Sequence, residues 1–147
     1  TEGLVGSEMC IRDSLMSKAY LKKIIARSAE DLQIISACCS EGKVKISDIK
    51  YLKKNKIFLI NINRIAKEIE NSSNKLNSII RFEYIQASKS KNIDQKKQNQ
   101  DLELISIDIF KKNNIFEITL LFMNNKIITL SAEIIEVTLE DQKNIDD

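Results

Sequence analysis

Residues 102–132, LELISIDIFKKNNIFEITLLFMNNKIITLSA, hold three runs of apolar and β-branched residues separated by short polar turns. The runs extend from Leu102 to Phe110, from Ile115 to Met123 and from Lys126 to Ala132. Asn124-Asn125 suits a type I′ turn, because asparagine tolerates positive φ. The stretch predicts three consecutive strands, and the change of apolar phase after Leu104 indicates either a bulge or a strand covered on both faces.

Upstream of this stretch, the periodicity predicts one helix and several further strands. Ser28 to Glu41 has a serine cap, acidic residues in its first turn and apolar residues at helical spacing. Gly42 follows where a C-terminal glycine belongs. The predicted strands are Leu21 to Ala26, Val44 to Leu52, Ile57 to Ile62 and Ile80 to Ala87, with a polar reversal at Lys53 to Lys56.

Three segments give weaker signals. Lys67 to Ser78 has little periodicity, and Ser88 to Asp101 is rich in Lys, Asn and Gln, which predicts a long solvated loop. Ile134 to Leu139 is compatible with a last strand or with a closing helix. Residues 142–147 are acidic and are expected to fray.

Together these segments predict an α+β domain, mainly antiparallel β, spanning residues 16–141. About seven strands should form a strongly curved sheet or a partly open barrel, with the early helix packed on it. On element order alone, the nearest architecture is a pleckstrin-homology-like barrel.

The N-terminal segment Leu4 to Asp13, LVGSEMCIRD, resembles one reading frame of a transposon-end adapter used in DNA sequencing. The same run precedes unrelated reading frames in metagenomic assemblies. We therefore expect residues 1–15 to be non-native and disordered, and the native chain to begin at Met16. Without them the net charge rises from +2 to +4, which is too little to indicate nucleic-acid binding by itself.

The composition excludes several kinds of catalytic site. The chain has no His, and residues 16–147 contain a single Gly, which rules out a glycine-rich phosphate loop. No CxxC pair is present, and no apolar run is long enough to span a membrane. Cys38 and Cys39 are adjacent, which disfavours a disulfide between them and indicates a reducing cytoplasm. We expect no catalytic residue, no metal site and no cofactor.

Lysine-bearing turns are the strongest candidate site, since they could form a positive rim that binds phosphates. The alternative is that these lysines only keep the turns soluble in a protein from an AT-rich genome. Arg64 ends an apolar strand and is either a buried pairing or binding group, or a cap with its head in water. The predicted anion-binding residues are Lys53, Lys54, Lys56, Lys89, Lys91, Lys111, Lys112 and Arg64.

The order of several short motifs resembles domain-of-unknown-function family 2948, an uncharacterised and mainly alphaproteobacterial family. The motifs include Glu30-Asp31-Leu32, Asn63-Arg64, Arg81-Phe82-Glu83 and Ile135 to Asp141. Ser40-Glu41 and Asn124-Asn125 depart from the family's usual pattern. Because the family has no established activity, the resemblance implies a small cytosolic bacterial protein and assigns no functional residue.

These observations favour a non-enzymatic binding or scaffold module that acts on another protein through a strand edge or the basic loops. The second hypothesis is binding of an anionic surface, a nucleic acid or a phosphorylated ligand through the basic loops. The third is an enzyme that uses a metal or carboxylates such as Asp31, Asp94 or Asp101, for which a pocket shared with another acid is the criterion.

Overall fold

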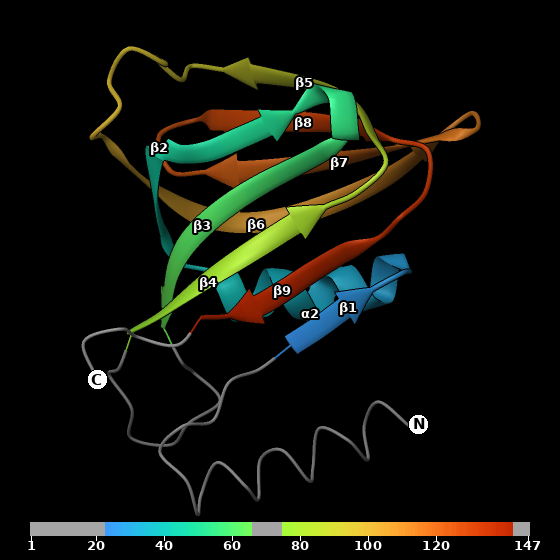
Figure 1. The fold of residues 1–147 in the computed structure, drawn as a ribbon, viewed down its shortest axis with the longest axis horizontal. Helices are drawn as coiled ribbons and strands as arrows, with labels where there is room; N and C mark the ends of the chain where they lie inside the picture. Colours follow the sequence, from blue (N-terminus) through green and yellow to red (C-terminus); the bar gives the residue numbers. More distant parts are fainter. Residues whose placement is uncertain (1–22, 66–74, 143–147) are drawn as a thin grey trace, which may run out of the picture.

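The structure is a computed structural model that describes residues 23–65 and 75–142, without the side chain of Lys75. The predictions for residues 1–15 and for the tail 143–147 lie outside the described residues. The elements, shown in Figure 1, are β1 (Lys23–Ala26), α2 (Ala29–Cys39), β2 (Lys43–Leu52), the 3₁₀ turn η1 (Lys53–Asn55), β3 (Ile57–Ile65), β4 (Lys75–Phe82), β5 (Ile85–Lys91), β6 (Asp101–Lys112), β7 (Ile115–Phe122), β8 (Lys126–Ala132) and β9 (Val137–Asp141).

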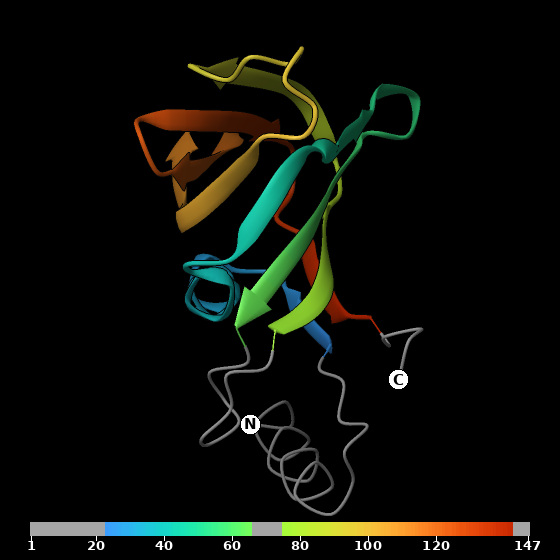
Figure 2. The same cartoon turned by 90° about the vertical axis from the view of Figure 1, so that its left-hand side faces the viewer.

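The nine strands of the described residues belong to one open antiparallel sheet with the order β1-β9-β4-β3-β2-β6-β7-β8-β5. The link between its two halves is short, since β2 pairs with β6 only from Lys43 to Lys45. The halves therefore turn toward each other and enclose the core, as Figure 2 shows. Helix α2 covers one end of this core, where it packs against β6, β1 and β3.

Alternation along the strands builds the core. On β3, Phe58, Ile60 and Ile62 are buried, and they share the core with the buried face of β7. The helix adds Leu32, Ile35 and Cys39, all fully buried. Its N-terminus begins as predicted, because Ser28 Oγ accepts a hydrogen bond from Asp31 N (3.1 Å).

The C-terminal strands confirm the sequence prediction closely. Asn124 and Asn125 have positive φ values of 65° and 59°, as predicted, although the loop between the paired Phe122 and Lys126 holds three residues, Met123 to Asn125. The register between β6 and β7 shifts between Leu104 and Ser106, so the change of apolar phase marks a bulge. Residues 137–141 form a strand, which decides between the two alternatives left open for this segment.

The prediction of about seven strands was wrong, because residues 137–141 add a last strand and because the run from Ile80 to Ala87 is not one strand. It breaks at Glu83 and Tyr84, and Tyr84 has a φ of 60°. The break sends β4 to pair with β3 and β9, while β5 pairs with β8 in the other half of the sheet. The predicted loop from Ser88 is also too long, since β5 continues to Lys91. The likeness to a pleckstrin-homology barrel stays a prediction.

Gly42 is needed for space. The left-handed residue after α2 is Glu41, with a φ of 71°. A Cβ atom on Gly42 would lie 2.7 Å from Ile62 Cδ1 and 2.8 Å from the Cys39 carbonyl oxygen. The glycine therefore lets the end of the helix approach β3.

We expect Gly42→Ala to lower the free energy of unfolding by about 1–3 kcal/mol, because the added methyl group overpacks this contact. Urea unfolding followed by circular dichroism measures the change. In an Ile62→Val background the nearest clashing atom is absent, so the same substitution should cost less. An equal cost in both backgrounds would contradict a steric role for this contact.

Candidate binding site at the edge of the sheet

A local arch in β2 creates the space for a pocket. The five-residue step from Val44 to Ile49 on β2 is matched by only a two-residue step, from Ile62 to Ile60, on β3. Within the arch, the Ile46 and Ser47 N–H groups donate to carbonyl oxygens in the 92–100 loop, at 3.1 and 3.0 Å. The arch thus leaves β3 and attaches to the loop that follows β5.

We call the resulting cavity the edge pocket, and its volume is about 310 Å³. Its apolar part includes Ile46, Ile49, Phe58 and Ile128. Its polar part consists of serine and glutamine side chains from β5 and from the loop, together with Tyr51. The full lining is Ile46, Ile49, Tyr51, Phe58, Ser88, Ser90, Ile93, Gln95, Gln98 and Ile128, none of which is charged.

One side of the edge pocket is the last strand of the sheet. β5 pairs with β8 on one side, and at its start the Ile85 N–H donates to the Lys56 carbonyl oxygen (2.8 Å). Among residues 23–65 and 75–142, no other strand pairs with β5. Its outer edge therefore presents backbone donors and acceptors beside the pocket.

Sequence reasoning missed this site, because it placed Ser88 to Lys91 in a loop. Ser88 and Ser90 line the pocket, whereas Lys89 and Lys91 occupy the alternate positions and point to the other face of β5. The alternating motif Ser-Lys-Ser-Lys is the signal that could have indicated a strand. The contribution of Ile46 and Ile49 could not be read from sequence, since it depends on the arch.

The predicted anion-binding lysines lie outside the edge pocket. Lys53 and Lys54 are on η1, which contacts β5. Lys56 Nζ forms an ion pair with Glu133 Oε1 (3.1 Å), an atom that also accepts a hydrogen bond from Gln86 Nε2 (2.7 Å). The hydrogen bond from Gln86 has the largest effect on Glu133. Together with the hydrogen bond from Lys56, it holds the pKa of Glu133 below its usual value.

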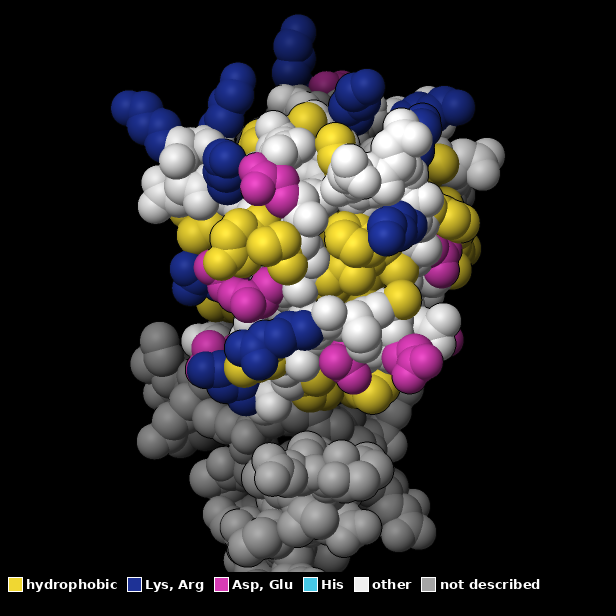
Figure 3. Space-filling view, turned by 90° about the vertical axis from the view of Figure 1, so that its right-hand side faces the viewer, with side chains coloured by type: hydrophobic (Ala, Val, Ile, Leu, Met, Phe, Trp, Pro, Cys, Tyr) yellow, Lys and Arg dark blue, Asp and Glu magenta, His cyan; other side chains and the backbone are white. Residues whose placement is uncertain are grey.

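Lys111 and Lys112 lie at the end of β6, where they pair with Phe116 and Ile115 of β7. Figure 3 shows Lys and Arg side chains gathered mainly at the upper end of one side of the molecule, above a band of apolar side chains. Binding of an anion by the lysines stays a prediction.

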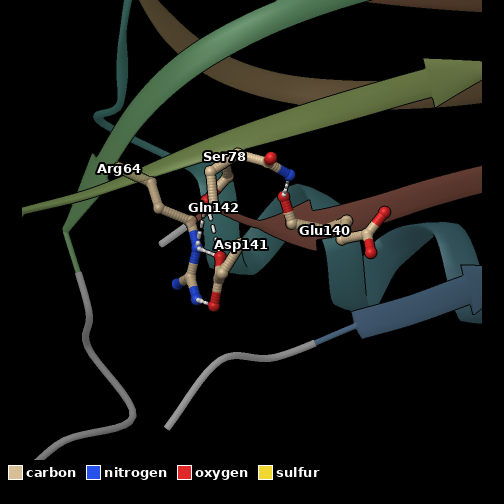
Figure 4. Close-up of polar contacts among 5 residues, drawn as sticks. All are labelled: Arg64, Ser78, Glu140, Asp141 and Gln142. Atoms are coloured by element: carbon tan, nitrogen blue, oxygen red, sulfur yellow. Dashed lines mark hydrogen bonds and ion pairs between the residues drawn. The ribbon is translucent and has the colours of Figure 1, made fainter. Parts of the chain in front are cut away.

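Arg64 is a buried pairing group, one of the alternatives that the sequence left open. Its side chain is fully buried, and Nε and Nη2 donate to the two carboxylate oxygens of Asp141 at 2.9 and 2.8 Å (Figure 4). Ser78 Oγ donates to Asp141 Oδ1 (2.5 Å) and accepts from Arg64 Nε (3.2 Å). The cluster links three adjacent strands, β3, β4 and β9.

The carboxylates considered for catalysis have different surroundings. Asp31 Oδ2 accepts from the Arg27 N–H (3.4 Å), and Asp94 Oδ1 accepts from the Lys96 N–H (3.0 Å), so both support local backbone turns. Asp101 meets the stated criterion, because it lines a second pocket together with Asp48. Within the described ranges, no group of three or more His, Cys, Asp or Glu residues could hold a metal ion.

Folding also brings together Glu83 and Glu136, which are distant in sequence. The pKa of Glu83 is raised by partial burial and by a side-chain hydrogen bond with Glu136, while the nearby Arg81 charge opposes this shift. Arg81 Nη2 lies 3.8 Å from Glu83 Oε1, and Arg27 Nε lies 3.6 Å from Glu136 Oε1. These side chains line a third pocket, on the outer face of β1, β9 and β4.

We expect Glu83→Gln to raise the melting temperature at neutral pH. The pKa of Glu83 in the folded state lies above the ordinary value of 4.5. Such a carboxyl group destabilises the fold at any pH at which it is charged, that is, at a pH above its pKa in the folded state. The gain should shrink as the pH falls through that pKa toward 4.5, where both states become protonated. Melting curves measured from about pH 4 to about pH 8 test this, because that range includes the pH values at which a carboxyl group with a raised pKa loses its proton. A gain independent of pH, or an equal gain from Glu140→Gln on the same face, would contradict it.

We expect Arg64→Met to lower the free energy of unfolding by about 3–5 kcal/mol, since the Asp141 carboxylate loses its guanidinium partner inside the core. Guanidinium chloride unfolding measures this cost. The double substitution Arg64→Met/Asp141→Leu should recover most of it, because it removes both charges. A double variant as unstable as the single one would show that the loss is not electrostatic.

Comparisons with known proteins place the chain in a family. Residues 22–146 match the family described as "Protein of unknown function (DUF2948)". No curated protein matches the chain. A solved structure, titled "Crystal structure of an uncharacterized protein from Neisseria gonorrhoeae", is similar with a TM-score of 0.44 and 17% identity, covering 80% of this chain and 95% of that one.

Among the described residues, no helix has the length and apolar character needed to cross a membrane. The family match extends over most of the sequence and confirms the resemblance inferred from the short motifs. The chain belongs to the DUF2948 family of proteins of unknown function.

Proposed function

We propose that this protein is a non-enzymatic binding module that takes up an extended segment of a partner protein along the outer edge of β5. The observation that carries the proposal is the position of that edge directly beside the edge pocket. Backbone groups of the partner would add a strand to the sheet, and one of its side chains would enter the pocket. This is the mode of recognition known as β-strand addition.

The edge pocket suits an apolar side chain of a partner. Its inner surface includes Ile46, Ile49, Phe58 and Ile128, and its serine and glutamine side chains could donate hydrogen bonds to the backbone of a bound segment. At about 310 Å³ it is near the lower limit of small-ligand pockets, which run from roughly 300 to 1,000 Å³. In a strand added to a sheet, alternate side chains point to one face, so specificity would come from a single apolar residue and its neighbours.

Charge around the pocket favours an acidic segment. The segments that form most of the lining, residues 46–51 and 88–98, carry five lysines and only two aspartates. Lys89 and Lys91 lie on β5 itself, and Lys53 and Lys54 lie on the neighbouring turn. Lysines on an edge strand also oppose pairing between two copies of the same chain, which favours a different partner.

Two finer features belong to this proposal. We place the protein in the bacterial cytoplasm, where adjacent cysteines such as Cys38 and Cys39 stay reduced.

A second candidate function is the binding of a nucleic acid or another phosphorylated ligand by the lysines at the upper end of the molecule in Figure 3. Steep weakening by salt fits both candidates, so a test must also locate the bound molecule.

Selection from a random peptide library displayed on phage provides the probe. We expect enriched peptides to carry one apolar residue flanked by Asp or Glu, and to protect the amides of Ala87 to Lys91 from hydrogen exchange. Ser88→Phe fills the pocket from β5 and should weaken binding by about tenfold or more. Ala87→Phe places the same ring on the other face of the strand and should bind like the wild type.

Three results would overturn the proposal: no enriched peptide, protection confined to another edge, or equal losses from the Ser88 and Ala87 substitutions. Binding of a short single-stranded DNA with protection of η1 and the β6–β7 turn would favour the second candidate instead.

A further inference from the structure

The second pocket lies on the other face of the sheet from the core. Asn61 and Asn63 alternate with the buried Ile60 and Ile62 along β3, so their side chains point outward. Asn63 pairs in register with Lys43 on β2 and with Asn77 on β4. We call this cavity the amide pocket; its volume is about 320 Å³, and it is lined by Lys43, Lys45, Asp48, Asn61, Asn63, Asn77 and Asp101.

The charges in the amide pocket do not neutralise one another. Within the described part of the chain, no ion pair joins Asp48 or Asp101 to either lysine of the pocket. Lys43 Nζ instead lies 3.8 Å from Glu103 Oε1, outside the lining. Two lysines and two carboxylates therefore line the same cavity, and among the described residues Lys45, Asp48 and Asp101 form no ion pair.

Asn61 adds a hydrogen-bond acceptor that has no partner. Its Oδ1 atom is buried and, among the described residues, accepts no hydrogen bond. A buried amide oxygen of this kind is unfavourable unless a donor reaches it. Asparagine is also a poor strand former, yet Asn61, Asn63 and Asn77 occupy interior positions of two neighbouring strands.

We propose that the amide pocket binds a small zwitterion of the free amino-acid class. The ammonium group of such a ligand would donate to Asp48, Asp101 or, after a small movement of side chains that uncovers it, the Asn61 oxygen, and its carboxylate would accept from Lys43 and Lys45. The lining contains no apolar or aromatic side chain, which disfavours an apolar or stacked ligand. This site is independent of the edge pocket and of the proposed partner.

Thermal denaturation with the standard L-amino acids, added one at a time, is the screen, followed by calorimetry of those that stabilise the protein. We expect at least one amino acid to raise the melting temperature, since it binds the folded state alone. Acetate and methylammonium, which each carry one of the two charges, should bind about tenfold more weakly or worse. Inorganic phosphate should have no comparable effect.

Variants separate the ligand site from a structural role. Asn61→Val removes the unpartnered acceptor, so the ligand-free protein should be as stable as the wild type or more stable, while the amino-acid effect disappears. If Asn61→Val does not fold, Asp48→Asn takes its place as the test variant, and we expect it to lose the amino-acid effect as well. Asn55→Val, at an exposed turn outside the pocket, should keep it.

The proposal is overturned if no amino acid raises the melting temperature of the wild-type protein. It is also overturned if phosphate or acetate binds as tightly as the best amino acid, or if the Asn55 variant loses the effect equally.

Discussion

The buried ion pair between Arg64 and Asp141 sets the register on which the rest of the structure depends. A charge inside the core is tolerated only with a close partner of opposite sign, and here the partner comes from the last strand of the sheet. A slip of one residue in β3, β4 or β9 would turn Arg64, Ser78 or Asp141 toward the opposite face. The cluster therefore specifies how three strands align, and through β9 it also positions β1.

With that register in place, two local irregularities create the candidate sites. The break at Glu83 and Tyr84 moves β5 into the other half of the sheet, where it becomes the edge strand. The arch between Val44 and Ile49 pulls β2 away from β3. The arch also interrupts the alternation of side chains along β2, so Ile46 and Ile49, three residues apart, line one pocket, while Lys45 and Asp48 line the other.

The two pockets differ in chemistry for this reason. The edge pocket is uncharged and lies beside unpaired backbone groups, which suits an extended peptide. The amide pocket is lined entirely by polar and charged side chains, which suits a small polar ligand. A binding module that takes a peptide on one side and a small molecule on the other would have two sites separated by one strand.

Local patterns in the sequence determined the helix from its Ser28 cap, the three strands of residues 102–132, the turn at Asn124-Asn125 and the family. The helix, the strands and the turn could be predicted because they depend on residues close together in the sequence. Only the tertiary structure decided the burial of Arg64, the split that makes β5 an edge, and the two pockets. These depend on contacts such as Arg64 with Asp141, which are 77 residues apart, and on the way the arch of β2 leaves β3 and attaches to the loop that follows β5.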